Sequence, residues 1–121
     1  MSKAKILLVS NDVLTGRLWL DQLSQNGYSV FGVSSADEGL AYAAREEFDL
    51  AIVDVGDPAL AGITLCRRLR SKETKFILLL GYIDTDEYML VAFEAGVDGY
   101  LVKPISPCLF LARVRAVLRR L

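Results

Sequence analysis

The sequence predicts an α/β domain in which a five-stranded parallel sheet is covered by helices on both faces. Apolar runs recur five times along the 121 residues, segments with helix signals separate them, and hydrophobic residues make up 53% of the chain. Most of the runs are continuously apolar, as expected for strands that are buried on both faces. Alternating strands and helices give a parallel sheet with right-handed crossovers. The length fits one domain, residues 1–121.

The five apolar runs are the predicted strands, at residues 6–9, 30–33, 50–53, 76–80 and 100–102. The first predicted helix covers residues 13–26, where leucines recur three and four residues apart and Gly27 provides a stop. Ser35 and Glu38 have the spacing of a capping box, which predicts a second helix that runs through Arg45. A third, short helix is predicted over residues 63–70, with basic residues at its end.

The last two helices have clear start and stop signals. The fourth is predicted to start at Asp84 or Thr85, with acidic residues in its first turn, and to end at Gly96. Ser106 and Pro107 form an N-cap and first-turn pair for the fifth helix. Its predicted apolar stripe consists of Phe110, Val114, Val117, Leu118 and Leu121.

Composition excludes several classes of function. Fourteen basic and fifteen acidic residues give a formal charge of −1, which argues against a domain whose own surface grips nucleic acid. The chain has no histidine, which excludes a histidine-based triad, and its two cysteines match no zinc-site spacing. Cys66 and Cys108 are expected to be free thiols. With no membrane-length apolar run and no signal peptide, a cytoplasmic protein is expected.

Four of the predicted strands end at residues that can be located from the sequence, and in such sheets ligands bind beyond the carboxyl ends of the strands. These residues are Ser10, Asn11 and Asp12 after the first strand, Asp54 after the third, Gly81 after the fourth and Lys103 after the fifth. A carboxylate that follows four apolar residues is costly unless it is paired or used. From the residues alone, Asp54 and Lys103 fit a structural ion pair and a functional site equally well.

Three motifs resemble the receiver domain of two-component response regulators. Residues 48–54, followed by Pro58 and Gly62, resemble its phosphoacceptor strand and loop, and residues 93–104 resemble its fifth-strand signature. Residues 111–120 are similar to the last receiver helix of winged-helix, DNA-binding regulators. The resemblance covers the whole chain and implies a flavodoxin-like, doubly wound (βα)5 fold with strand order 2-1-3-4-5.

The resemblance implies a role for each site residue. Asp54 would accept a phosphoryl group from a sensor histidine kinase or a phosphotransfer protein. Lys103 would pair with Asp54 and then with a phosphoryl oxygen, as a mobile point charge can, and its bond to Pro104 is expected to be cis. Gly56 would offer a backbone carbonyl to Mg²⁺. Tyr100 would be the switch aromatic, although an ordinary strand aromatic explains it equally well.

The sequence departs from the family pattern at two places. Ser10 and Asn11 replace the two acidic residues that hold Mg²⁺, so the candidate ligands are Asp54, Asn11, Gly56 and Asp12. Because Mg²⁺ favours carboxylate oxygen, weak or absent binding is expected.

The second departure is Gly81, which replaces the Ser or Thr whose hydroxyl bonds the phosphoryl group in the family. The hypothesis is therefore an atypical receiver, in which signalling depends little on phosphorylation. The alternative is a vestigial receiver that acts only as a protein-interaction module.

Other classes are less well supported. A flavin- or nucleotide-binding domain could share the architecture, but the chain has no Gly-x-Gly-x-x-Gly fingerprint. An enzyme is not expected, because no nucleophile–base pair is present. The resemblance also implies a homodimer through the fourth helix, fifth strand and fifth helix, where Asp98 and Arg113 match interface positions. Gly99 replaces a second acid there, so a weak or absent dimer is expected. A DNA-binding output domain beyond this chain is also implied.

Overall fold

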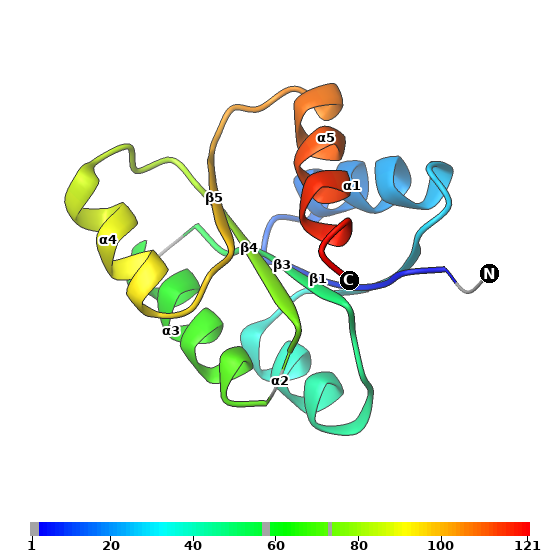
Figure 1. Ribbon diagram of the computed structural model, residues 1–121, viewed down its shortest axis with the longest axis horizontal. Coiled ribbons are helices and arrows are strands. Elements are labelled where there is room, and N and C mark those ends of the chain that lie inside the picture. The colour runs from blue at the N-terminus through cyan, green and yellow to red at the C-terminus, as the bar shows by residue number, and fades with distance from the viewer. Residues whose placement is uncertain (1–2, 57–58, 73) are drawn as a thin grey trace.

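The computed structural model describes residues 3–56, 59–72 and 74–121. Strands and helices alternate five times along the chain (Figure 1). The elements are β1 (Lys5–Ser10), α1 (Val13–Gln25), β2 (Ser29–Val33), α2 (Ala36–Arg45), β3 (Leu50–Asp54), α3 (Ala59–Arg70), β4 (Phe76–Gly81), α4 (Asp86–Glu94), β5 (Gly99–Val102) and α5 (Pro107–Leu118). The strands are parallel in the order β2-β1-β3-β4-β5, which confirms the predicted fold and strand order.

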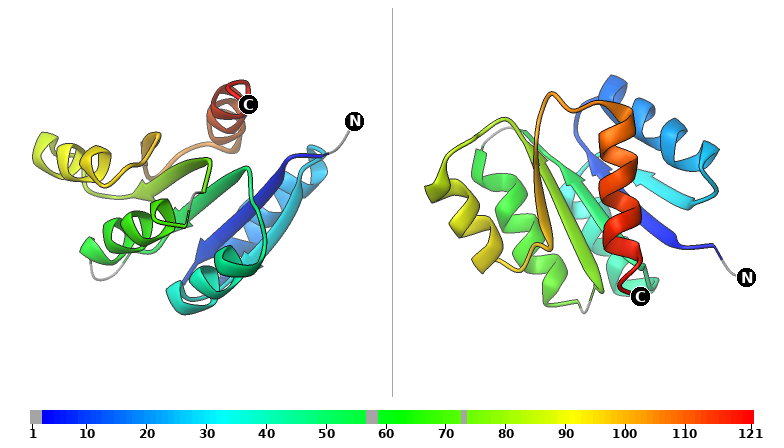
Figure 2. Two further views of the ribbon diagram at one scale, coloured as in Figure 1. Left: turned by 60° about the horizontal axis from the view of Figure 1, so that its bottom comes forward. Right: turned by 45° about the horizontal axis from the view of Figure 1, so that its top comes forward.

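Helices cover both faces of the sheet (Figure 2). Along β1, Ile6 and Leu8 contribute to one core, and Leu7 and Val9 contribute to the other. Helices α1 and α5 pack on the first core, while α2, α3 and α4 pack on the second. Because successive side chains of a strand point to opposite faces, a strand with both faces covered needs an unbroken apolar run. This is why the predicted strands could be recognised from the sequence.

Most predicted helix ends are confirmed by capping contacts. The hydroxyls of Ser35, Thr85 and Ser106 each accept a hydrogen bond from the backbone N–H three residues later, at the start of α2, α4 and α5. Gly27 and Gly96 have φ values of 88° and 106°, in the left-handed region that glycine adopts most easily.

One predicted helix start and one member of a predicted apolar stripe were wrong. Helix α3 begins at Ala59 rather than at residue 63, because residues before Ile63 continue the helix against the sheet. Gly62 is buried there, and a Cβ on it would lie 2.9 Å from the Leu79 side chain. Helix α5 ends at Leu118, so Leu121 is exposed and does not extend the apolar stripe. Within the described residues, no helix has the length and apolar character needed to cross a bilayer.

Candidate functional site

The predicted site residues meet at the carboxyl ends of the central strands. Asp54 is the last residue of β3 and lies opposite Ser10, the last residue of β1. Lys103 directly follows β5, and its peptide bond to Pro104 is cis, as expected. The sheet thus brings together residues that are more than forty positions apart in the sequence.

Asp54 is only 2% exposed, and both of its carboxylate oxygens accept hydrogen bonds. The Lys103 ammonium donates to Oδ1 at 2.5 Å, and the Trp19 indole Nε1–H donates to Oδ2 at 3.1 Å. A buried carboxylate needs a countercharge and hydrogen-bond donors, because burial removes its solvation by water. Lys103 supplies the countercharge, and Trp19 satisfies the second oxygen.

Trp19 is the site residue that sequence reasoning missed. It lies in α1, is 3% exposed and stacks on Phe110 of α5, with ring centroids 4.3 Å apart and an interplanar angle of 26°. A signal for it was present, because a tryptophan on the apolar face of a helix must find an acceptor for its N–H. The acceptor could not be identified without the fold.

The residues after β1 are engaged in starting α1. The Asp12 carboxylate caps the helix, accepting from the backbone N–H of Leu14 at 3.1 Å and from the Thr15 hydroxyl at 2.8 Å. The Thr15 hydroxyl bond lowers the pKa of Asp12. The Ser10 hydroxyl donates to the Asp12 carbonyl at 3.1 Å, and Asn11 is exposed.

These residues do not form an acidic cluster that fits a tightly held Mg²⁺ ion. Such an ion favours several carboxylate oxygens, whereas both Asp54 oxygens already accept hydrogen bonds and the Asp12 carboxylate caps a helix. Among the residues that the structure describes, no three Asp, Glu, Cys or His side chains form a group that could hold a metal ion. Gly56 is exposed after β3, and Pro58 of the same loop lies outside the described residues.

The Tyr100 hydroxyl lies in the space that a side chain at residue 81 would occupy. Tyr100 turns toward the loop after β4 and donates from its hydroxyl to the Ile83 carbonyl at 2.8 Å. A Cβ on Gly81 would lie 2.7 Å from that hydroxyl oxygen, closer than a real Cβ contact allows. Gly81 and Tyr100, the two predicted switch positions, are therefore in direct contact.

The neighbouring Tyr82 places its ring 4.6 Å from the Lys103 ammonium, in cation–π range.

Comparison with known proteins identifies the family. The family model described as the response regulator receiver domain matches residues 6–115. The chain belongs to the response regulator receiver domain family. It is similar to the alkaline phosphatase synthesis transcriptional regulatory protein PhoP of Bacillus subtilis, at 38% identity over 117 residues. That alignment covers 96% of this chain and 49% of PhoP, so the receiver spans about half the length of this relative.

Solved structures agree with this assignment. A CheY-like receiver domain protein from Methanospirillum hungatei superposes with a TM-score of 0.89 at 27% identity, covering 98% of this chain and 96% of that one. The BeF3-activated DrrB receiver domain has a TM-score of 0.85 at 29% identity, covering 98% and 99%. Receivers are signalling domains of two-component systems. The comparisons give no support to the flavin-binding alternative or to a phosphorylation-independent interaction module.

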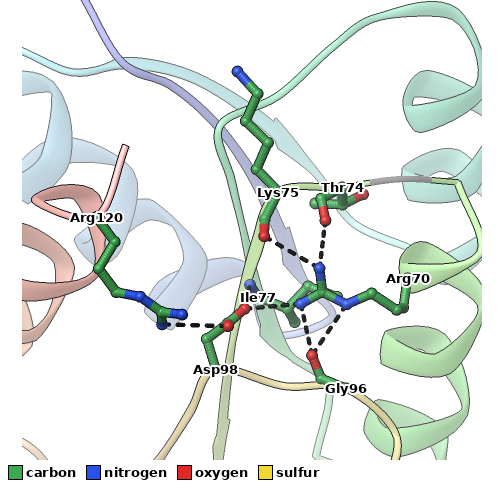
Figure 3. Close-up of polar contacts among 7 residues, drawn as sticks. All are labelled: Arg70, Thr74, Lys75, Ile77, Gly96, Asp98 and Arg120. Atoms are coloured by element: carbon green, nitrogen blue, oxygen red, sulfur yellow. Dashed lines mark hydrogen bonds and ion pairs between the residues drawn. The ribbon is translucent and has the colours of Figure 1, made fainter.

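The predicted dimer-face acid of the receiver is engaged within the chain. Asp98 accepts from the Arg70 guanidinium and from the backbone N–H of Ile77, both at 2.8 Å, and from Arg120 at 3.4 Å (Figure 3). Its side chain is 16% exposed. Arg113, the other predicted interface residue, is exposed on α5.

Proposed function

We propose that this receiver accepts a phosphoryl group on Asp54 from a phosphohistidine of a sensor kinase or a phosphotransfer protein. The observation that supports this most strongly is the buried Asp54–Lys103 pair at the carboxyl edge of the central strands. An ion pair costs desolvation and is weak evidence of stabilisation by itself. A buried acid at the ligand-binding edge of a parallel sheet is better explained by a chemical role.

In the proposed transfer, an Asp54 oxygen bonds to phosphorus while the phosphorus–nitrogen bond of the donor breaks. The electron pair of that bond stays on the imidazole nitrogen. Lys103 moves from the carboxylate to a phosphoryl oxygen, since its long side chain can follow the group. Its cation–π contact with Tyr82 gives the ammonium a second partner during that movement.

We further propose that this receiver depends less on phosphorylation than the family pattern implies. Weak Mg²⁺ binding is expected because Ser10 and Asn11 contribute no negative charge. Gly81 offers no hydroxyl to the phosphoryl group, and a hydrogen bond to a charged group contributes about 1.5–3 kcal/mol. Both departures lower the population of the modified, switched form.

The experiment is modification by acetyl phosphate over a series of Mg²⁺ concentrations, followed on a phosphate-affinity gel and by intact mass. We expect partial modification that disappears in Asp54→Asn. Complete, Asp54-dependent modification at low millimolar Mg²⁺ would show that the site is not weakened. No modification at any Mg²⁺ concentration would refute the phosphoacceptor role.

The partners are part of the same proposal. PhoP is named as a transcriptional regulatory protein and is about twice the length of the matched region, so we propose a DNA-binding output domain for the whole protein. We propose a weak homodimer through α4, β5 and α5, because Asp98 already has partners within its own chain.

We also propose a cytoplasmic location for this protein. The free thiols of Cys66 and Cys108 agree with a reducing compartment.

A further inference from the structure

The Trp19–Asp54 contact is a feature that the proposed function does not use. Trp19 comes from α1 and donates to Oδ2 of Asp54, whereas Lys103 follows β5 and donates to Oδ1. The two donors differ in freedom of movement. The indole is 3% exposed and held against Phe110, whereas the Lys103 ammonium ends a flexible chain.

This difference assigns separate roles to the two carboxylate oxygens. Lys103 can leave Oδ1 and follow a phosphoryl group, so Oδ1 is the oxygen that is free to attack phosphorus. Trp19 cannot follow, since its ring is enclosed by the α1–α5 packing. Its N–H therefore stays on Oδ2, which becomes the carbonyl oxygen of the acyl phosphate.

We propose that Trp19 is a positioning residue that restrains the phosphorylation of Asp54 by stabilising its unmodified carboxylate. This rests on the proposed function, in which Asp54 is the phosphoacceptor. Before transfer, Oδ2 shares a full negative charge, and afterwards it belongs to a neutral acyl group. A hydrogen bond to a charged acceptor is stronger than one to a neutral acceptor. An interaction that is stronger in the ground state than in the transition state opposes the reaction.

The indole N–H satisfies the Asp54 carboxylate in a site that lacks the acidic pair. Ser10 and Asn11 bring no charge that could hold a cation beside Asp54, so the neutral indole N–H becomes the second group that satisfies the carboxylate. The difference between a charge-assisted and a neutral hydrogen bond corresponds to roughly tenfold in an equilibrium constant. Removing only the N–H should therefore raise the modified fraction of Asp54, relative to unmodified protein, about tenfold.

Trp19 is the only tryptophan in the chain, so it can be replaced globally in a tryptophan-auxotrophic host. The replacement is benzothienylalanine, which keeps the bicyclic shape and has sulfur in place of the N–H. Wild-type and replaced proteins, with folding checked by circular dichroism, are treated with acetyl phosphate at one fixed Mg²⁺ concentration. In this reaction the Asp54 Oδ1–phosphorus bond forms, the phosphorus–oxygen bond of acetyl phosphate breaks and acetate leaves with the electron pair. The readout is the ratio of modified to unmodified mass.

A ratio that is about tenfold higher in the replaced protein supports the inference. An equal or lower ratio overturns it, while the phosphoacceptor role stands because Asp54 is modified in both proteins. If neither protein is modified, the inference and the proposed function both fail.

A second measurement needs no phosphorylation and no replaced tryptophan. The single indole ¹H–¹⁵N cross-peak is compared between wild type and Asp54→Asn, whose side-chain oxygen is a neutral acceptor. We expect the proton to move upfield in Asp54→Asn, and in the same direction when beryllium fluoride is added to wild type. An indole N–H that does not bond the Asp54 carboxylate would not respond to the charge on residue 54. A cross-peak that stays in place in Asp54→Asn overturns the inference.

Discussion

The contact between Tyr100 and Gly81 leads to a quantitative prediction. In Gly81→Ala, the new Cβ would lie 2.7 Å from the Tyr100 hydroxyl oxygen, and the ring would have to move. That movement breaks the hydrogen bond to the Ile83 carbonyl, worth about 0.5–1.5 kcal/mol. It also disturbs the ring contact with Tyr88, with centroids 5.4 Å apart, worth up to about 1.5 kcal/mol.

One effect opposes this cost. Replacing glycine by alanine reduces the conformational entropy of the unfolded chain, which stabilises the folded state by about 0.4–1 kcal/mol where the backbone allows alanine. Gly81 ends a β-strand and is not in the left-handed region. The expected net result is a loss of about 1–2 kcal/mol in the free energy of unfolding.

The assay is urea denaturation followed by far-ultraviolet circular dichroism, in wild-type and Tyr100→Phe backgrounds. Phenylalanine lacks the hydroxyl that meets the new Cβ, so in that background the entropic effect should dominate and Gly81→Ala should stabilise the fold by up to about 1 kcal/mol. The coupling between the two sites measures the clash directly. If Gly81→Ala costs the same in both backgrounds, Tyr100 does not occupy the space beside Gly81 and the reasoning is refuted.

Three further predictions test other parts of the domain. Calorimetry should detect weak Mg²⁺ binding in wild type and binding at least about tenfold tighter in Asn11→Asp, since Mg²⁺ favours carboxylate; equal affinities would contradict this. Asp98→Asn should cost about 1–3 kcal/mol in urea unfolding, because Asp98 accepts several hydrogen bonds to charged or backbone donors. Arg120 is exposed and lies 3.4 Å from Asp98, so Arg120→Ala should lower the free energy of unfolding by less than about 1 kcal/mol. A larger loss for Arg120→Ala than for Asp98→Asn would contradict this prediction. Burial raises the pKa of Cys66 from 9.0 to about 12, so the stability that this thiol contributes is complete below pH 9 and falls as the pH rises toward 12. Between pH 9 and pH 12, the melting temperature of Cys66→Ala should therefore fall less than that of wild type. Cys108 is exposed, so the melting temperature of Cys108→Ala should fall as much as that of wild type.

The sequence was sufficient to predict the parallel sheet and the edge where Asp54 and Lys103 lie, because both depend on patterns with a direct physical cause, whereas the strand order was implied by the resemblance to receiver domains. Continuous apolar runs mark strands buried on both faces, and the edge where such strands end determines where Asp54 and Lys103 meet. The start of α3 was missed because Gly62 disfavours a helix locally but packs closely against Leu79 in the fold.

Contacts that depend on side-chain direction could not be predicted. The leucine spacing that predicted α1 did not place Trp19, and Leu14 and Leu18 of that pattern are exposed, so neither the burial of Trp19 nor its hydrogen bond to an oxygen 35 residues away was predicted. The absence of a side chain at residue 81 was interpreted only as a lost hydroxyl. The structure adds that Tyr100 fills the space that a side chain would need.

The Arg70 guanidinium has a mechanical consequence. It donates to the backbone carbonyls of Thr74, Lys75 and Gly96 as well as to Asp98, and so ties the end of α3 to the segments that enter β4 and β5. These strands are anchored at the edge opposite Asp54. Helix α4 is thereby tied at its carboxyl end, while its amino end contacts Tyr100 through the Tyr88 ring and follows the loop whose Ile83 carbonyl accepts a hydrogen bond from Tyr100. The Arg70 contacts therefore hold the carboxyl end of α4 and the amino ends of β4 and β5 together, at the edge of the sheet away from Asp54.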